Sequence, residues 1–525
     1  MKRRDFLKAG LLGGAATVLG AGAQARKEES PSALVGQVGP FEFDEATIAD
    51  LRAAMKEGKE TAHSIAEKYL ARIEEIDKNG PMLSSVLAVN PEALEHAAKL
   101  DKMEPVGLLH GIPVLIKDNI GMAGKLPTTC GSLAFAENFT ADAHIVSRLK
   151  KAGAVIIGKT NLSEWANFRS THSSSGWSGV GGQCKNPYAL DRNPCGSSSG
   201  SGAACAANLC AVAVGTETDG SIVCPSTTNG LVGIKPTLGL IPGHGIVPLS
   251  HSQDTAGPMC RTVTDAAKLL EVLSGVLPKA GPGRSFTDYL RKDGLKGARI
   301  GIARKFFGFN DKVDYVMHEA ILALKEAGAI IVDPADLPSH GKYDDTEFEV
   351  LLYDFKADIN KYLAARKLEC KSLADLIKFN EKNKAKEMPF FGQEIFHMAQ
   401  AKGPLTEKKY KDALAKNHRM SRKEGIDAVM DKHKLDAIIA PTGGPAWTTD
   451  LINGDHFSGG SSTPSAVSGY PAITVPAGMV RGLPVGITFF GKAWSEGTLI
   501  KLAYAFEQET KVRKAPKFLM RAELE

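Results

Sequence analysis

Two serines and one lysine, far apart in the sequence, have the residue types that nucleophilic catalysis requires. Residues 195–202 form a glycine- and serine-rich tract that contains Ser197, and residues 215–221 end at Ser221. Lys117 closes an apolar stretch well upstream of both. Because burial disfavours the charged ammonium, a lysine at this place can be a neutral amine that accepts a proton. The three residues therefore predict a serine hydrolase site that uses lysine instead of histidine.

Ser221 is the predicted nucleophile of this site. It follows Thr218, Asp219 and Gly220, whose backbone can turn sharply and direct successive N–H groups at a developing oxyanion. Neutral Lys117 would take the serine proton during attack on a carbonyl carbon and return it to the leaving group. Water would then release the acyl group by the same steps.

The chain resembles the amidase signature family of serine hydrolases over roughly residues 40–515. The resemblance rests on the lysine and the two serine blocks, joined in family order by Gly158-Lys159-Thr160-Asn161-Leu162-Ser163-Glu164-Trp165, Gly230-Leu231-Val232-Gly233-Ile234-Lys235-Pro236-Thr237, Asp254-Thr255-Ala256-Gly257-Pro258 and Gly469-Tyr470-Pro471-Ala472-Ile473-Thr474-Val475-Pro476. It implies that Ser197 relays the proton from Ser221 to Lys117, and that the Gly196–Ser197 peptide bond is cis. It also implies one mixed sheet flanked by helices. The implied activity is that of an amidase that needs no cofactor and hydrolyses a carboxamide to a carboxylic acid and ammonia or an amine.

Departures from the usual family pattern resemble its peptide amidase branch. Cys195 and Ser199 replace glycines of the glycine-serine block, and Asp219 replaces the first glycine of the Gly-Gly-Ser block. Residues 161–186 also resemble peptide amidases. C-terminal peptide amides are therefore the first expected substrates, while fatty or aryl amides stay open as alternatives.

Other interpretations of the same residues stay open. Residues 196–200 match the G-x-S-x-G elbow of α/β-hydrolases, which would make Ser198 the nucleophile, although residues 186–194 before it form a poor strand. Taken singly, Lys117 is typical of a surface lysine, and a serine-glycine tract of a flexible loop. The chain could also be a glutaminyl-tRNA amidotransferase-like subunit, which acts in the cytosol with partner subunits, or a non-catalytic amide-binding protein.

The N-terminus predicts a twin-arginine export signal over residues 1–25. Arg3 and Arg4 precede a Gly/Ala-rich apolar stretch that is shorter than the roughly 20 apolar residues of a membrane span. Residues 23–25 fit a small-residue cleavage site. The mature enzyme, residues 26–525, is expected in the periplasm or outside the cell, with the twin-arginine machinery as a partner. An uncleaved N-terminal anchor is the alternative.

Composition argues against several classes of function. The formal net charge of +5 falls to about +2 without the presequence, so nucleic-acid binding is not expected. No later segment is long and apolar enough for stable membrane insertion. No metal is expected, because His318-Glu319 begins a zinc-protease pattern that lacks its second histidine.

The 8 cysteines are expected to be buried free thiols rather than a disulfide framework. Substrates of the twin-arginine route fold in a reducing cytosol, where disulfides are rare. Cys195, Cys205, Cys210 and Cys224 lie around the serine blocks, and no two cysteines have Cys-x-x-Cys spacing.

Apolar patterning predicts a single large α/β domain. Short β-branched runs alternate with helical segments, and this alternation favours a mixed, mostly parallel sheet flanked by helices. These runs occupy residues 114–116, 155–157, 300–302, 330–332 and 437–439.

Three further segments have a predicted structure. Residues 44–77 have helical spacing, and residues 202–214 predict a tightly packed buried helix whose end could be a strand. Residues 306–435, approximately, predict a charged, helical variable region. Its aromatic side chains either line a substrate pocket or pack the helices onto the sheet.

Overall fold

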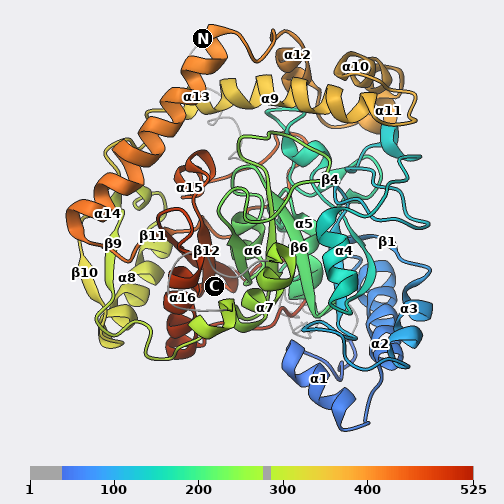
Figure 1. The fold of residues 1–525 in the computed structure, drawn as a ribbon, viewed down its shortest axis with the longest axis horizontal. Coiled ribbons are helices and arrows are strands. Elements are labelled where there is room, and N and C mark those ends of the chain that lie inside the picture. Colours follow the sequence, from blue (N-terminus) through green and yellow to red (C-terminus); the bar gives the residue numbers. More distant parts are fainter. Residues whose placement is uncertain (1–37, 276–284, 524–525) are drawn as a thin grey trace, which may run out of the picture.

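The computed structural model describes residues 38–275 and 285–523. The predicted export signal, residues 1–25, lies outside these ranges. The described residues form an α/β unit around an 11-stranded sheet in the order β1-β3-β2-β6-β8-β7-β12-β13-β11-β9-β10 (Figure 1). The strands of this sheet are β1 (Val86–Val89), β2 (Pro113–Lys117), β3 (Val155–Thr160), β6 (Val212–Glu217), β7 (Val232–Lys235), β8 (Thr255–Cys260), β9 (Arg299–Ile302), β10 (Ile330–Val332), β11 (Ala437–Pro441), β12 (Ala472–Val480) and β13 (Leu483–Phe490). A separate ribbon pairs β4 (Trp177–Ser178) with β5 (Gly182–Gln183).

The predicted mixed sheet flanked by helices is confirmed. Parallel pairs form two wings, β3-β2-β6 and β11-β9-β10. Antiparallel pairs join the strands between these wings and add β1 at one edge. All five runs predicted as strands are strands, and all of them lie in the parallel wings. Parallel pairing, predicted for most of the sheet, is therefore concentrated in the wings.

Helices cover this sheet and extend beyond it along one side (Figure 1). They are α1 (Ile48–Lys56), α2 (Ala62–Ile73), α3 (Ala93–Leu100), α4 (His144–Lys151), α5 (Ser199–Ala206), α6 (Val223–Thr228), α7 (Val263–Ser274), α8 (Asp311–Glu326), α9 (Asp344–Ala364), α10 (Leu373–Lys382), α11 (Lys384–Glu387), α12 (Glu394–Gln400), α13 (Lys408–Ser421), α14 (Asp427–His433), α15 (Thr463–Ser468) and α16 (Glu496–Thr510).

The predicted helical segment 44–77 forms two helices, α1 and α2. Gly58 separates them with a φ of +70°, a left-handed conformation that glycine adopts without strain. A capping box then starts α2, in which Thr61 and Ser64 satisfy each other's backbone amides. Ile48 and Leu51 of α1 are buried, and so are Ile65, Tyr69 and Ile73 of α2, whereas Ala54 and Met55 are partly buried. The buried positions anchor this N-terminal pair on the rest of the core.

The small-residue segment after the serine tract divides into the buried helix α5 and the strand β6. Gly200 shows why small residues are needed, since a Cβ there would lie 2.2 Å from Ser85 O and 2.5 Å from Asn161 O. The predicted helix thus holds for its first half, and its end is a strand.

The region around residues 306–435 is mainly helical, as predicted, although it also contributes the edge strand β10. In Figure 1, its long helix α9 lies across the top of the molecule next to α10, α11 and α12, and α13 runs from the top down the left side toward α14. They form a cover over one side of the sheet, above the site described next.

Candidate active site

Lys117 is the last residue of β2 and is completely buried. Its Nζ donates hydrogen bonds to Ser197 Oγ at 2.7 Å, to Thr216 Oγ1 at 2.9 Å and to Thr216 O at 3.3 Å. Burial lowers the pKa of this amine to about 7, because little water is available to solvate an ammonium. Lys117 is therefore not a surface lysine, and at neutral pH a substantial fraction of it is uncharged.

Ser197 lies in the loop before α5 and is also completely buried. Its peptide bond with Gly196 is cis, as the family resemblance implied. The backbone oxygen of Ser197 accepts a hydrogen bond from Ser163 N at 3.1 Å. A Cβ on Gly196 would lie 2.2 Å from Ser163 Oγ, so only glycine fits there. The serine-glycine tract is thus a packed loop, and it holds Ser197 against Lys117.

Ser221 lies in the turn between β6 and α6, with 7% of its surface exposed. Its backbone oxygen accepts a hydrogen bond from Ser198 N at 3.2 Å, which joins this turn to the loop of Ser197. Gly220 has a φ of +77°, which lets the backbone turn sharply before the serine. The predicted nucleophile and the predicted relay are therefore held on adjacent segments.

The predicted oxyanion residues form the turn just before Ser221. Their side chains are fastened on both sides, because Thr218 Oγ1 donates to Asp254 Oδ1 at 2.7 Å and Thr463 Oγ1 donates to Asp219 Oδ2 at 2.7 Å. Within residues 38–275 and 285–523, the amides of Asp219 and Gly220 donate no hydrogen bond. They are therefore available to a negative oxygen, which is what an oxyanion hole requires.

Ser198 does not have the setting of a nucleophile. Its Oγ donates to Thr216 O at 3.0 Å, and Thr216 N donates to the same Oγ at 3.1 Å, which clamps the loop onto β6. Residues 186–194 contain only isolated bridges, whereas a nucleophile elbow needs a strand directly before it. The geometry argues against the α/β-hydrolase interpretation.

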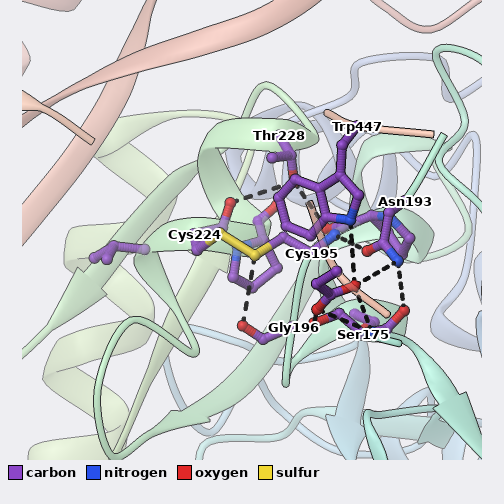
Figure 2. The surroundings of a disulfide bond; sticks show 12 residues. Ser175, Asn193, Cys195, Gly196, Cys224, Thr228 and Trp447 are labelled. Atoms are coloured by element: carbon purple, nitrogen blue, oxygen red, sulfur yellow. Dashed lines mark hydrogen bonds between the residues drawn. A yellow bond between two sulfur atoms is a disulfide. The ribbon is translucent and has the colours of Figure 1, made fainter. Parts of the chain in front are cut away.

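Cys195 and Cys224 form a disulfide with their Cα atoms 6.1 Å apart (Figure 2). The expectation of free thiols is wrong for this pair, because folding brings the loop of Ser197 onto the start of α6. The expectation holds for the remaining cysteines, which are buried and free: Cys130, Cys184, Cys205, Cys210, Cys260 and Cys370. The bridge ties the segment that precedes Ser197 to the helix that follows Ser221.

The bridge is itself enclosed by polar contacts. Figure 2 shows Asn193, Ser175 and Trp447 around it. Asn193 Oδ1 accepts the hydrogen bond of Cys195 N at 2.8 Å, and Asn193 Nδ2 donates to Ser175 O at 2.9 Å. These contacts fix the direction in which the chain enters the loop of Ser197.

A cavity of about 760 Å³ adjoins the site. It is lined by Thr216, which binds Lys117, and by Thr218 of the oxyanion turn. Phe355 and Tyr362 of α9 also line it, so some aromatic residues of the variable region do border a cavity. Others pack helices together instead, among them Phe396 in the hydrophobic cluster beneath α9 and α12. The cavity has an apolar wall and meets the candidate site at Thr216 and Thr218, while Lys117, Ser197 and Ser221 are not among its lining residues.

Thr216 and Asn119 were missed by sequence analysis. Asn119 Nδ2 donates to Thr216 Oγ1 at 3.0 Å, and the same oxygen accepts from Lys117 Nζ at 2.9 Å. Both residues lie inside the blocks that contain Lys117 and Ser221. Both are polar residues at the end of an apolar run that predicts a buried strand, and this pattern could have identified them from the sequence.

Two other features bear on function. Across the described part of the chain, no group of three or more His, Cys, Asp or Glu side chains is arranged to hold a metal ion. In the same residues, no helix combines the length and apolar character needed to cross a membrane.

Known proteins with similar sequences and structures place this geometry in a family. The Amidase family matches residues 64–500. Peptide amidase from Stenotrophomonas maltophilia is 45% identical, with a TM-score of 0.86 over 91% of this chain and 100% of that one. A probable amidase from Arabidopsis thaliana is 42% identical over 91% of this chain and 93% of its own length. One subunit of the glutamyl-tRNA(Gln) amidotransferase from Thermoanaerobacter pseudethanolicus is 32% identical over 91% of this chain and 99% of its own.

These similarities span almost the whole described chain, and the blocks that carry Lys117, Ser197 and Ser221 lie inside the matched range. The chain therefore belongs to the amidase signature family, and it is an amidase, a hydrolase of amide bonds.

Proposed function

We propose that this amidase acts through Ser221 as nucleophile, Ser197 as proton relay and Lys117 as the group that takes and returns the proton. The observation that carries the proposal is the buried Lys117 amine, with its pKa near 7, held 2.7 Å from Ser197 Oγ. No histidine is needed in this scheme, because the lysine itself supplies a base at neutral pH.

The reaction then follows from the positions of these groups. Ser221 Oγ attacks the amide carbon while its proton passes through Ser197 to Lys117. The negative oxygen that develops on the substrate binds to the amides of the turn at residues 218–220. Lys117 returns the proton through Ser197 to the leaving nitrogen, and the C–N bond breaks. Water attacks the acyl-enzyme in the same way and releases the carboxylic acid.

C-terminal peptide amides are the proposed substrates. Support comes from the similarity to peptide amidase over nearly the whole chain, at a higher identity than to the tRNA amidotransferase component. The cavity beside the site has room for an acyl group, and its walls include Phe355 and Tyr362. Fatty and aryl amides stay as alternatives with the same chemistry.

We also propose that the enzyme works in the periplasm or outside the cell. The support is the twin-arginine pattern of residues 1–25, which the cytosolic amidotransferase function would not need. This sequence pattern is the reason why we rank the amidotransferase function second.

The direct test is product analysis with the mature protein. A C-terminal peptide amide should yield the peptide acid and ammonia in equal amounts, and the Ser221→Ala variant should yield neither. Fatty amides, aryl amides and glutamine are assayed in parallel at the same concentration. Turnover of glutamine alone, or turnover that persists in Ser221→Ala, would contradict the proposal.

A further inference from the structure

Asp219 stands where the family usually has glycine, and the proposed mechanism uses only its backbone amide. Its carboxyl group is nevertheless in a defined setting. Oδ2 accepts the hydrogen bond of Thr463 Oγ1, whereas Oδ1 is buried and has no hydrogen-bond partner among the described residues. A buried carboxylate oxygen without a donor is costly, so this oxygen calls for a proton or a donor beside it.

Glu347 of α9 and Ser462 are the further side chains that lie against Asp219, and of these two only Glu347 can carry a charge. It is 7% exposed, and its Oε1 accepts a hydrogen bond from Gln253 Nε2 at 2.9 Å. The same Gln253 nitrogen donates to Thr218 O at 3.2 Å. Gln253 therefore bridges Glu347 of α9 and the oxyanion turn, in addition to the direct contact between Glu347 and Asp219. Two ionised carboxylates in contact would repel each other strongly in such an environment.

Other charged groups surround the pair without removing this repulsion. Lys235 at the end of β7 and Glu217 at the end of β6 face Asp219, while Tyr343 and Asp344 face Glu347 from the start of α9. Burial is the main cause that raises the pKa of Glu347 well above its usual range, and the charge of Asp219 raises it further. Glu347 is therefore the member of the pair that holds a proton.

We propose that Asp219 and Glu347 share one proton and act as a positioning pair for the oxyanion turn. The Glu347 hydroxyl donates to the otherwise unpaired oxygen of Asp219, which fastens the turn to α9. Loss of that proton at higher pH leaves two carboxylates in contact, and their repulsion moves the amides of Asp219 and Gly220 out of alignment. The inference rests on the proposed function, because it concerns the turn that binds the oxyanion.

The test is the pH profile of kcat on a peptide amide for wild type, Glu347→Gln and Glu347→Ala. Wild type should lose activity on the alkaline side as the shared proton is released. Glu347→Gln should keep most of the activity and lose this alkaline decline, because the glutamine amide donates to Asp219 at every pH. Glu347→Ala should lower kcat about 10- to 100-fold at every pH, since it leaves the turn without its fastening.

Glu349→Gln is the matched control on the same helix. Glu349 pairs with Lys402 and Lys409 instead of the oxyanion turn, so this variant should keep the wild-type profile. Circular dichroism over the same pH range separates loss of activity from unfolding. The Gln variant keeps the test decisive even if Glu347→Ala fails to fold.

The outcomes separate this inference from the proposed function. Absence of wild-type turnover on any amide would count against the proposed function. With turnover present, the inference is overturned by an alkaline decline that persists in Glu347→Gln, by a wild-type profile without such a decline, or by equal losses in the Gln and Ala variants.

Discussion

At the residue scale, the proposed chemistry depends on keeping one lysine uncharged inside the protein. Lys117 Nζ has its hydrogen-bond partners in the hydroxyl groups of Ser197 and Thr216, and neither partner carries a charge. None of these contacts is an ion pair, so nothing in direct contact compensates a charge on the amine. This setting supports the proposal that a lysine takes the place that histidine has in many hydrolases.

Replacement of Ser221 separates the two serine hypotheses. Ser221→Ala should abolish covalent labelling by a fluorophosphonate and lower kcat by several orders of magnitude, because the acyl bond can no longer form. Ser198→Ala should keep the labelling. It should cost about 1–3 kcal/mol of stability, since Ser198 Oγ makes two buried hydrogen bonds to Thr216.

Labelling is measured by intact mass, and stability by urea unfolding of the same samples. The control is unmodified wild type at equal concentration. Label retained by Ser221→Ala and lost by Ser198→Ala would restore the α/β-hydrolase interpretation.

Lys117 predicts the pH dependence on the acidic side. Its pKa in the folded protein is lowered from 10.5 to about 7, and only the neutral amine accepts a proton. Activity should therefore be low below pH 7 and rise as the pH passes through about 7. The kcat of wild type across this range, with a peptide amide as substrate, checks the direction and the midpoint.

Lys117→Ala tests the same residue by substrate chemistry. Amide turnover should fall by several orders of magnitude and the acidic limb should vanish, because amine departure needs the returned proton. An activated ester should be affected less, since its leaving group needs little protonation. Equal losses on amide and ester would remove Lys117 from its role as proton shuttle.

At the scale of elements, the site is an assembly of strand ends and loops that one disulfide and a few hydrogen bonds join. Lys117 ends β2, the oxyanion turn follows β6, and both strands lie side by side in one parallel wing. The loop of Ser197 crosses over them and enters α5. The bridge from Cys195 to Cys224 then connects the start of this loop to α6.

The Cys195–Cys224 bridge should contribute to stability and to the geometry of the site. A disulfide restricts the unfolded chain, so the Cys195→Ser/Cys224→Ser variant should lose about 2–4 kcal/mol in the free energy of unfolding. Its activity should also fall, because both serine segments gain freedom. Guanidinium unfolding and amide turnover, with and without dithiothreitol, measure the two effects.

Two comparisons make this experiment specific. Wild type in dithiothreitol should match the double serine variant, while Cys370→Ser, at a buried free cysteine, should keep the response of wild type to the reductant. If mass spectrometry shows reduced thiols in wild type but dithiothreitol changes neither its unfolding nor its turnover, the bridge does not stabilise the protein.

The same elements show what sequence could and could not predict. Runs such as Val114–Ile116 and Ile300–Ile302 are buried on both faces, so continuous apolar residues mark them as strands. The central strand β8 contains Gly257 and Pro258, which hide its periodicity, and its pairing with β6 and β7 is a property of the tertiary fold. The catalytic blocks were recognisable because their residue types are local. The disulfide was not, since Cys195 and Cys224 meet only after folding.

At the scale of the whole molecule, a sheet with parallel wings supports the site from below while the variable helices enclose it from above. The pair formed by Asp219 and Glu347 lies at the junction of these two layers, and the cavity lined by Phe355 lies under the same helix. Changes in α9 can therefore alter substrate selection without disturbing Lys117 or the serines. This separation is consistent with one chemistry and many substrates within a family.

The proposed export concerns the whole molecule, because the twin-arginine route carries folded proteins. The hydrogen bond from Ser198 N to Ser221 O already holds the two serine segments together, so the fold can form in the reducing cytosol before Cys195 and Cys224 are oxidised. Replacement of Arg3 and Arg4 by lysine should therefore leave folded precursor in the cytosol with reduced thiols.

Cell fractionation with intact mass checks this prediction. The exported wild-type protein should begin at Arg26 and be lighter by the two hydrogens of the closed bridge, whereas the retained variant should begin at Met1 and react with a thiol reagent at both bridge cysteines after unfolding. A plasmid-borne variant with Arg3 and Arg4 intact but a substitution on the exposed surface, Lys384→Ala, serves as the control for expression. Export that is unchanged in the double-lysine variant would contradict the twin-arginine route, and a periplasmic protein that still begins at Met1 would show that the N-terminal segment is an anchor.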